Sequence, residues 1–251
     1  TATYFPNEPV SNDEMEEFLG MIGQTPSKSK RIVLRNNGIK SRFYALTREG
    51  KPTHTNAGMT AQAIRKMLGN DPEQIKAVDL LVCGTSSPDQ IMPSHAVMVH
   101  GELPESRSIE VVSPSGVCCA GMHALKYAYM AVKTGGAHQA VATGSERFSA
   151  ALKSEIFEEE AQKLKQLEEN PYIGFEKEFL RWMLSDGASS FLMSDKKNED
   201  GFSLRVDWIE GISYANEKEA CMYMGGEKLK DGRLKSYLDY SPAEIQAKSI
   251  M

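Results

Sequence analysis

Residues 108–144 read SIEVVSPSGVCCAGMHALKYAYMAVKTGGAHQAVATG, and this stretch decides the fold class. The apolar run at 108–113 predicts a strand, and the small residues after it predict a turn. The pattern over 118–133 predicts a helix that ends at two glycines, and the run at 138–144 predicts a second strand. A crossover of this length joins parallel strands, so the sequence predicts an α/β fold built on a βαβ unit.

Further elements are predicted on both sides of this unit. The continuous apolar run at 78–83 is typical of a strand that is covered on both faces of a sheet. Apolar spacing predicts helices over 56–68 and 92–100. Residues 182–194 predict a turn and then a buried strand, and alternation over 202–208 predicts an edge strand.

The predicted central helix is small or apolar on most of its faces. Its residues of this kind are Ala120, Gly121, Ala124, Leu125, Ala128, Ala131 and Val132. A helix of this composition is expected to be buried on nearly all sides, which indicates a position between two sheets.

Composition and charge exclude some classes of function. The chain has 251 residues, 41% of them hydrophobic and 25% charged, as in a globular protein with a substantial core. Its net charge of −5 argues against a nucleic-acid-binding protein. Basic residues concentrate between Lys28 and Lys51, and glutamates between Glu155 and Glu178. The basic segment fits either a solvated surface or a site for an anionic partner.

The cysteines show no metal-binding spacing, so no metal site is predicted. They are Cys83, Cys118, Cys119 and Cys221, and we expect reduced thiols in a cytoplasmic protein. No apolar run approaches the roughly 18 residues of a membrane-spanning helix, and no signal peptide is recognisable. We therefore expect neither export nor membrane insertion.

A cysteine between a strand and a buried helix has physical reasons to be reactive. The helix N-terminus offers unpaired N–H donors and a partial charge of about +0.5, which favour the thiolate. A sharp turn exposes the sulfur, and its own backbone N–H can stabilise an oxyanion. Thiolates attack thioesters, so acyl transfer is the predicted chemistry. The alternative is a pair of small hydrophobic residues packed beneath a sheet.

Five segments, in order, resemble the β-ketoacyl-acyl-carrier-protein synthase III family. Cys119-Ala-Gly-Met, after a strand and a turn of small residues, resembles the active-site segment of that family. The other segments are Gly38-Ile-Lys-Ser-Arg, Thr85-Ser-Ser followed by Met92-Pro-Ser-His-Ala, Thr143-Gly-Ser-Glu, and Ser185-Asp-Gly-Ala-Ser. The resemblance covers most of residues 1–195.

The resemblance implies a thiolase-like layered α/β/α/β/α fold, of which this chain supplies the N-terminal half with a mixed, mainly parallel sheet. Residues 1–240 would form this half, with the nucleophile helix and an acidic helical insert near 151–180. Residues 241–251 would begin a helix that leads into a C-terminal half. Ser241-Pro-Ala-Glu is a strong helix start, so we expect the chain to be incomplete.

The resemblance also implies decarboxylative Claisen condensation, in fatty-acid or secondary-metabolite (polyketide) synthesis. In this family a cysteine, here Cys119, takes an acyl group from a thioester and condenses it with a malonyl-type extender on acyl carrier protein. The substrates would be coenzyme A or acyl-carrier-protein thioesters, with no cofactor. A cytoplasmic homodimer that binds acyl carrier protein is expected. Two alternatives stay open: an acyltransferase to an alcohol or amine, and a non-catalytic subunit that binds carrier protein.

Four other residues are singled out by position. Arg31 stands where many relatives carry an aromatic residue that stacks on the adenine of coenzyme A, and a guanidinium can also stack there. Arg35 matches a family arginine near the substrate tunnel and is suited to a phosphate. Met92 resembles a residue that reaches into a partner's acyl pocket; the alternative is a core methionine. The family's catalytic His and Asn have no counterpart here, which leaves His123 as a candidate base or a groove-lining histidine.

Overall fold

The computed structural model describes residues 1–24, 26–27, 30–155, 180–199, 201–218 and 226–236. The chain divides into two compact units, each assembled from three segments. Unit 1 comprises residues 1–6, 54–147 and 186–212, and unit 2 comprises residues 7–53, 148–185 and 213–251. Two predicted features, residues 156–179 of the acidic insert and the helix at 241–251, lie outside the described residues. The single half-domain over 1–240 stays a prediction.

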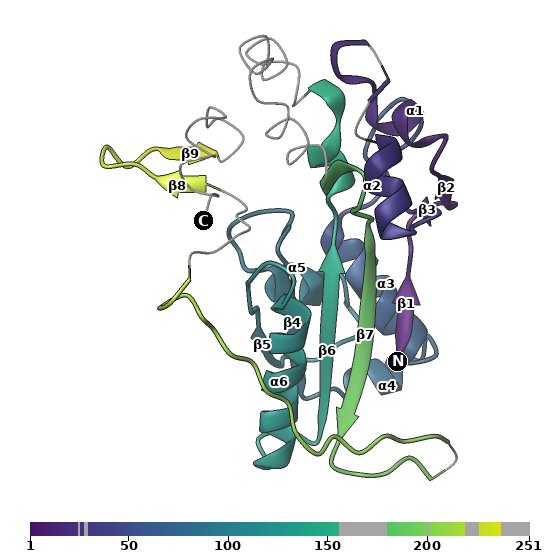
Figure 1. Ribbon diagram of the computed structural model, residues 1–251. Coiled ribbons are helices and arrows are strands. Elements are labelled where there is room, and N and C mark those ends of the chain that lie inside the picture. The colour runs from purple at the N-terminus through teal and green to yellow at the C-terminus, as the bar shows by residue number, and fades with distance from the viewer. Residues whose placement is uncertain (25, 28–29, 156–179, 200, 219–225, 237–251) are drawn as a thin grey trace. The chain divides into compact units, whose positions relative to one another are not determined.

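Unit 1 is built on a five-stranded mixed sheet (Figure 1). Its order is β1 (Ala2–Tyr4), β7 (Gly187–Ser194), β6 (Gln139–Glu146), β4 (Leu80–Gly84) and β5 (Glu110–Val112). β4 runs parallel to β5 and to β6, whereas β7 runs antiparallel to β6 and to β1. The predicted βαβ unit is confirmed, and β4 lies between its two strands.

Helices cover both faces of this sheet. α3 (Asn56–Met67) and α5 (His95–Gly101) contact one face, and α6 (Ala120–Lys133) contacts the other. The short α4 (Pro72–Lys76) precedes β4. The side chains of β4 alternate between the two sides: Leu81 and Cys83 join the apolar cluster of α3 and α5, while Leu80 and Val82 join that of α6. The prediction of a strand covered on both faces is therefore confirmed.

Two helices begin later than predicted. α5 begins at His95 because Ser94 has the extended backbone of an N-cap residue. α6 begins at Ala120, so Cys119 is its N-cap residue. Both helices otherwise span the expected residues.

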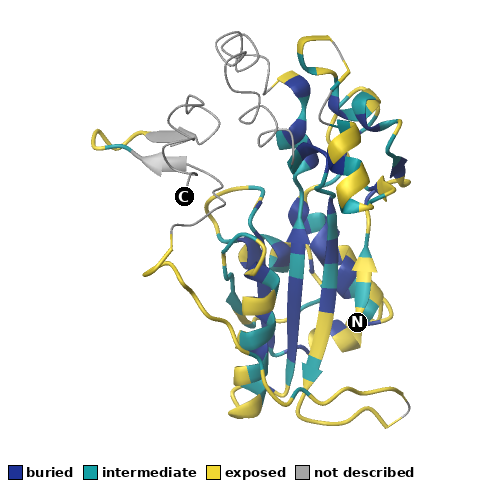
Figure 2. Cartoon of the chain, viewed as in Figure 1, coloured by how far each residue is buried: buried dark blue, intermediate teal, exposed yellow. Residues whose placement is uncertain are grey.

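The prediction that α6 is buried on nearly all sides is wrong for the described residues. Ala120, Ala124 and Ala128 are buried against the sheet, whereas Met122 and Met130 are exposed. Figure 2 shows both buried and exposed stretches along α6. The reason is that the described residues supply one sheet for this helix rather than two.

The edge strand predicted over 202–208 is also wrong. This segment forms no ladder with the described strands; it runs along α6, where the Tyr129 hydroxyl donates to the Asp207 carbonyl at 3.1 Å (Figure 1). Both edges of the sheet are formed by other strands, β1 and β5. Alternation is a local pattern, and it produces a strand only where a sheet edge is next to it.

Unit 2 contains short elements, of which those between residues 7 and 53 and between 148 and 152 supply most of a second core. They are β2 (Val10–Ser11), α1 (Met15–Leu19), the 3-10 helices Ile22–Gln24 and Ser149–Leu152, α2 (Lys30–Asn37), β3 (Ser41–Arg42), β8 (Gly226–Lys228) and β9 (Leu234–Ser236). Two arginines are buried in this unit and donate to backbone carbonyls, Arg42 to Trp182 and Arg181 to Leu152. Across the described parts of both units, no helix has the length and apolar character that crossing a membrane requires.

Candidate active site

The structure places the predicted site residues in two different units. Cys119 and Met92 belong to unit 1, and Arg31 and Arg35 belong to unit 2.

Cys119 stands at the end of the bend that joins β5 to α6. It is exposed, and no side chain caps the helix at this position. Gly116 has a φ of 143°, and a Cβ added to it would lie 3.2 Å from the Cys119 Sγ. The bend therefore needs glycine both for its backbone and for the space beside the sulfur.

Glycines also let the first turn of α6 lie directly on the sheet. A Cβ on Gly84, the last residue of β4, would be 2.2 Å from the Ala120 carbonyl oxygen. A Cβ on Gly121 would be 3.3 Å from the Cα of Gly144 in β6. Backbone thus contacts backbone, and the helix end that carries Cys119 is fixed against β4 and β6.

The described cysteines differ in their surroundings. Cys83 is fully buried in β4, and burial raises the pKa of its thiol to about 12, which excludes it as a nucleophile near neutral pH. Cys118 and Cys119 are both exposed, so the alternative of two buried packing residues is wrong. Because both thiols are exposed, exposure does not decide which of the two is the nucleophile. Cys221 lies outside the described residues.

His123 lies beside the same bend, one helical turn after Cys119. Its Nδ1 is 3.8 Å from the position of a Cβ on Gly116, and its Nε2 is 3.6 Å from that of a Cβ on Gly211. The imidazole and the Cys119 sulfur therefore border the same glycine, and the imidazole is exposed. His123 stays a candidate base.

A polar network holds the bend, and sequence reasoning assigned it no role. The Ser86 hydroxyl donates to the carbonyls of Gly116 and Val117, at 3.1 and 2.7 Å. The Glu146 carboxylate at the end of β6 accepts from the Ser86 backbone N–H at 2.8 Å and from the Ser87 hydroxyl at 2.5 Å. The Thr85 hydroxyl also donates to it, at 3.3 Å. The signal in the sequence was that the two quoted motifs stand at the ends of neighbouring strands: 85–87 directly follows β4, and 143–146 forms the end of β6.

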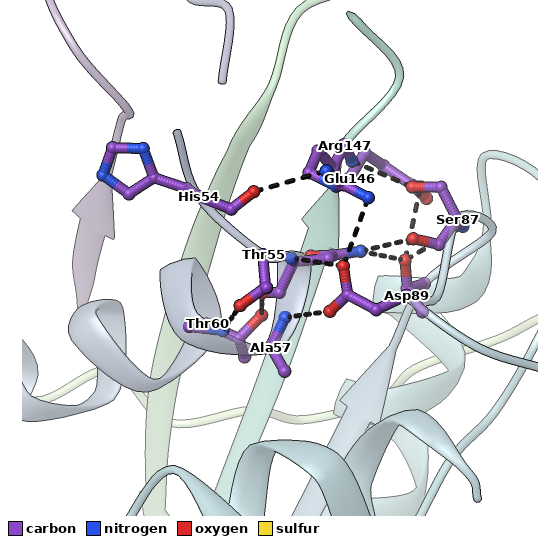
Figure 3. Close-up of polar contacts among 11 residues, drawn as sticks. His54, Thr55, Ala57, Thr60, Ser87, Asp89, Glu146 and Arg147 are labelled. Atoms are coloured by element: carbon purple, nitrogen blue, oxygen red, sulfur yellow. Dashed lines mark hydrogen bonds and ion pairs between the residues drawn. The ribbon is translucent and has the colours of Figure 1, made fainter. Parts of the chain in front are cut away.

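A second carboxylate, that of Asp89 in the same loop, joins this network to the start of α3 (Figure 3). Asp89 accepts from the backbone N–H groups of Asn56 and Ala57, at 2.9 and 2.8 Å, and pairs with Arg147 at 3.5 Å. The buried Asn56 amide donates to the Thr85 hydroxyl at 2.9 Å and to the Ser87 carbonyl at 2.8 Å. The loop after β4 is therefore held from both α3 and β6.

The remaining predicted residues are exposed. Met92 is 78% exposed, so the alternative of a core methionine is wrong. Arg31 and Arg35 lie one turn apart on α2, and both are exposed. Within the described ranges, no group of three or more His, Cys, Asp or Glu residues is arranged to hold a metal ion.

No protein-family model matches the chain. Over 149 residues, 59% of this chain, it is 30% identical to a β-ketoacyl-[acyl-carrier-protein] synthase III of Neisseria gonorrhoeae, and the match covers 43% of that relative.

Solved structures of condensing enzymes have the same fold. The tetronic acid condensing enzyme AbyA1 is similar with a TM-score of 0.60 and 21% identity, over 79% of this chain and 54% of that one. The 3-oxoacyl-(acyl carrier protein) synthase III, FabH, of Pseudomonas aeruginosa is similar with a TM-score of 0.56 and 18% identity, over 79% and 51%. The predicted thiolase-like α/β fold is thereby confirmed, and the chain spans about half the length of the proteins that it matches.

Proposed function

We propose that this chain, a partial thiolase-fold homologue of β-ketoacyl-acyl-carrier-protein synthase III, contributes the acyl-accepting cysteine of a condensing enzyme. The observation that carries the proposal is the exposed Cys119 at the N-terminus of α6. The buried Cys83 lacks this environment. Cys119 is chosen over Cys118 because it is the residue that directly precedes Ala-Gly, as in the family motif.

In the first step, the Cys119 sulfur attacks the carbonyl carbon of an acyl thioester. A carbon–sulfur bond to Cys119 forms, the bond to the primer's sulfur breaks, and the proton of Cys119 leaves with the released thiol. Backbone N–H groups at the start of α6 stabilise the negative charge, because a helix N-terminus has unpaired donors.

In the second step, a malonyl thioester loses carbon dioxide, and the resulting α-carbon attacks the acyl carbon on Cys119. A carbon–carbon bond forms and the Cys119 sulfur is released. The matched relatives are named as synthases of β-ketoacyl-acyl-carrier protein, and this supports a carrier-protein thioester as the extender here.

The proposed partners follow from the exposed residues. Acyl carrier protein or the phosphates of coenzyme A would meet Arg31 and Arg35 on α2, because exposed guanidinium groups bind anions. A homodimer in which the exposed Met92 contacts the partner subunit belongs to the same proposal.

The test is acylation of the protein by a radiolabelled acyl-CoA or acyl-carrier-protein thioester, followed by peptide mapping. We expect label on Cys119, complete loss of label in Cys119→Ser, and retention of label in the matched control Cys118→Ser. Label on Cys118 alone, or on neither cysteine, would contradict the proposal. Adding malonyl-carrier protein or an amine acceptor to the labelled protein then separates condensation from simple acyl transfer.

A further inference from the structure

We infer that Glu146 and Ser86 are positioning residues that hold the Cys119 sulfur at the start of α6. The inference deepens the proposed function and rests on the role of Cys119 stated there. Both residues act through the bend between β5 and α6.

The first link is the hydroxyl of Ser86. It donates to two consecutive carbonyls, those of Gly116 and Val117, at 3.1 and 2.7 Å. The Sγ of Cys119 lies 3.2 Å from the position of a Cβ on Gly116, so these carbonyls belong to the segment that lies against the sulfur. A shift of this segment changes where the sulfur lies relative to the helix N-terminus.

The second link is the carboxylate of Glu146. It accepts three hydrogen bonds from three consecutive residues of the loop after β4: the Thr85 hydroxyl, the Ser86 N–H and the Ser87 hydroxyl. Because a carboxylate offers about four acceptor positions, one side chain fixes the whole loop. The hydroxyl of Ser86 is thereby aimed at the bend.

The third link is the packing behind the loop. Thr85 and Ser87 are buried, and the fully buried Asn56 donates to both residues. β4, β6 and α3 therefore provide a rigid base for the Ser86 hydroxyl. The Ser86 hydroxyl can hold the bend in one position only if its own position is fixed, and this rigid base fixes it.

The experiment measures alkylation of individual cysteines by iodoacetamide, with peptide mapping, in the full chain. Cys119 reports the geometry of the bend. The fully buried Cys83 reports opening of unit 1, because alkylation needs access to the thiol. The variants are Ser86→Ala, Ser86→Thr, which keeps a hydroxyl, and Glu146→Gln. The matched control is Ser190→Ala, which removes another serine hydroxyl that donates to a backbone carbonyl, that of Ala63 at 2.8 Å.

We expect Ser86→Ala and Glu146→Gln to slow Cys119 alkylation by about fivefold, as the loss of one or two hydrogen bonds would do. Cys83 should stay protected, Ser86→Thr should recover part of the rate, and Ser190→Ala should leave the Cys119 rate unchanged. An unchanged Cys119 rate in both variants would overturn the inference. It would equally be overturned if Cys83 became reactive in both, because the two residues would then act only on stability.

This readout is separate from the test of the proposed function. Alkylation needs no acyl substrate, so a chain that resists acylation can still show the dependence on Ser86. In that outcome the proposed function fails and the positioning of Cys119 stands. Conversely, Cys119 can accept the acyl group while its alkylation rate is the same in the wild type and in the Ser86 and Glu146 variants. In that outcome the proposed function stands and the positioning inference fails.

Discussion

At the scale of single residues, His95 shows what burial does to a titratable group. Its Nε2 lies 3.1 Å from the Ser145 hydroxyl and 3.5 Å from that of Thr60, and its Nδ1 has no hydrogen-bond partner among the described residues. Burial lowers the pKa of His95 from 6.5 to about 4, against a smaller opposing effect of the Asp89 charge. The imidazole is therefore neutral in the folded protein at neutral pH.

The sign of the pH dependence follows from this pKa. Between pH 6.5 and about 4 the unfolded chain binds a proton on His95 that the folded chain does not, so the free energy of unfolding falls as the pH falls. We expect a loss of about 2 kcal/mol from this residue between pH 7.5 and pH 5. Urea denaturation at the two pH values should show a weaker pH dependence in His95→Gln than in the wild type.

His138 provides the control for this prediction. It is exposed, and its hydrogen bond with Asp195 raises its pKa, so its contribution to stability is lost as the pH rises through the folded-state pKa. His138→Gln should therefore keep the loss of stability on acidification. Equal pH dependence of the wild type and His95→Gln would show that the buried imidazole is not neutral.

At the scale of elements, the contact between α6 and the sheet depends on glycine. Gly84 ends β4 directly beneath the first residue of α6, and a Cβ there would meet the Ala120 carbonyl oxygen at 2.2 Å. The position of this Cβ is fixed by the backbone of residue 84, and the atoms that it would meet are backbone atoms of Ala120 and Gly121. No side-chain rotation can therefore relieve the contact. Either the helix or the strand has to move.

We expect Gly84→Ala to lower the free energy of unfolding by about 3 kcal/mol, as overpacking in a core does. The control is Gly101→Ala, because a Cβ on Gly101 meets nothing within 4 Å. That variant should change stability by less than about 1 kcal/mol, since alanine is also the better helix former. Chemical denaturation measures both, and equal stability of the two variants would contradict the tight packing of α6.

At the scale of the whole molecule, the chain exposes more large apolar side chains around α6 than a solvated helix needs. Met122 and Met130 are more than half exposed, and Phe202, Leu204 and Trp208 in the segment beside the helix are each at least 76% exposed. Exposed apolar surface of this kind favours association.

We expect the chain to self-associate, and the double substitution of Met122→Lys and Met130→Lys to weaken that association. Sedimentation velocity over a range of concentrations measures the effect. Met21→Lys, which changes an exposed methionine in unit 2, should leave association unchanged. A wild-type chain that stays monomeric at every concentration would refute the prediction.

The sequence by itself determined most of the local elements and singled out a candidate nucleophile. The two-face apolar run of β4, the small residues of α6 and the exposed cysteine before Ala-Gly are all readable from consecutive residues, because strand and helix patterns repeat over short distances. These patterns predicted an α/β fold with a reactive cysteine at 118 or 119, whereas the thiolase-like fold and the choice of Cys119 rested on the resemblance to the synthase III family. The positions of Met92, Arg31 and Arg35 were predicted, and their roles stay proposals.

Only the tertiary structure decided what holds the site in place. Ser86 reaches a bend 30 residues away and a carboxylate 60 residues away, and no local period records such contacts. The exposure of α6 and the unpaired segment over 202–208 were likewise decided by which strands form the sheet and its edges. Local patterns fix the conformation of a segment, whereas its hydrogen-bond partners and its burial depend on chain folded next to it from elsewhere in the sequence.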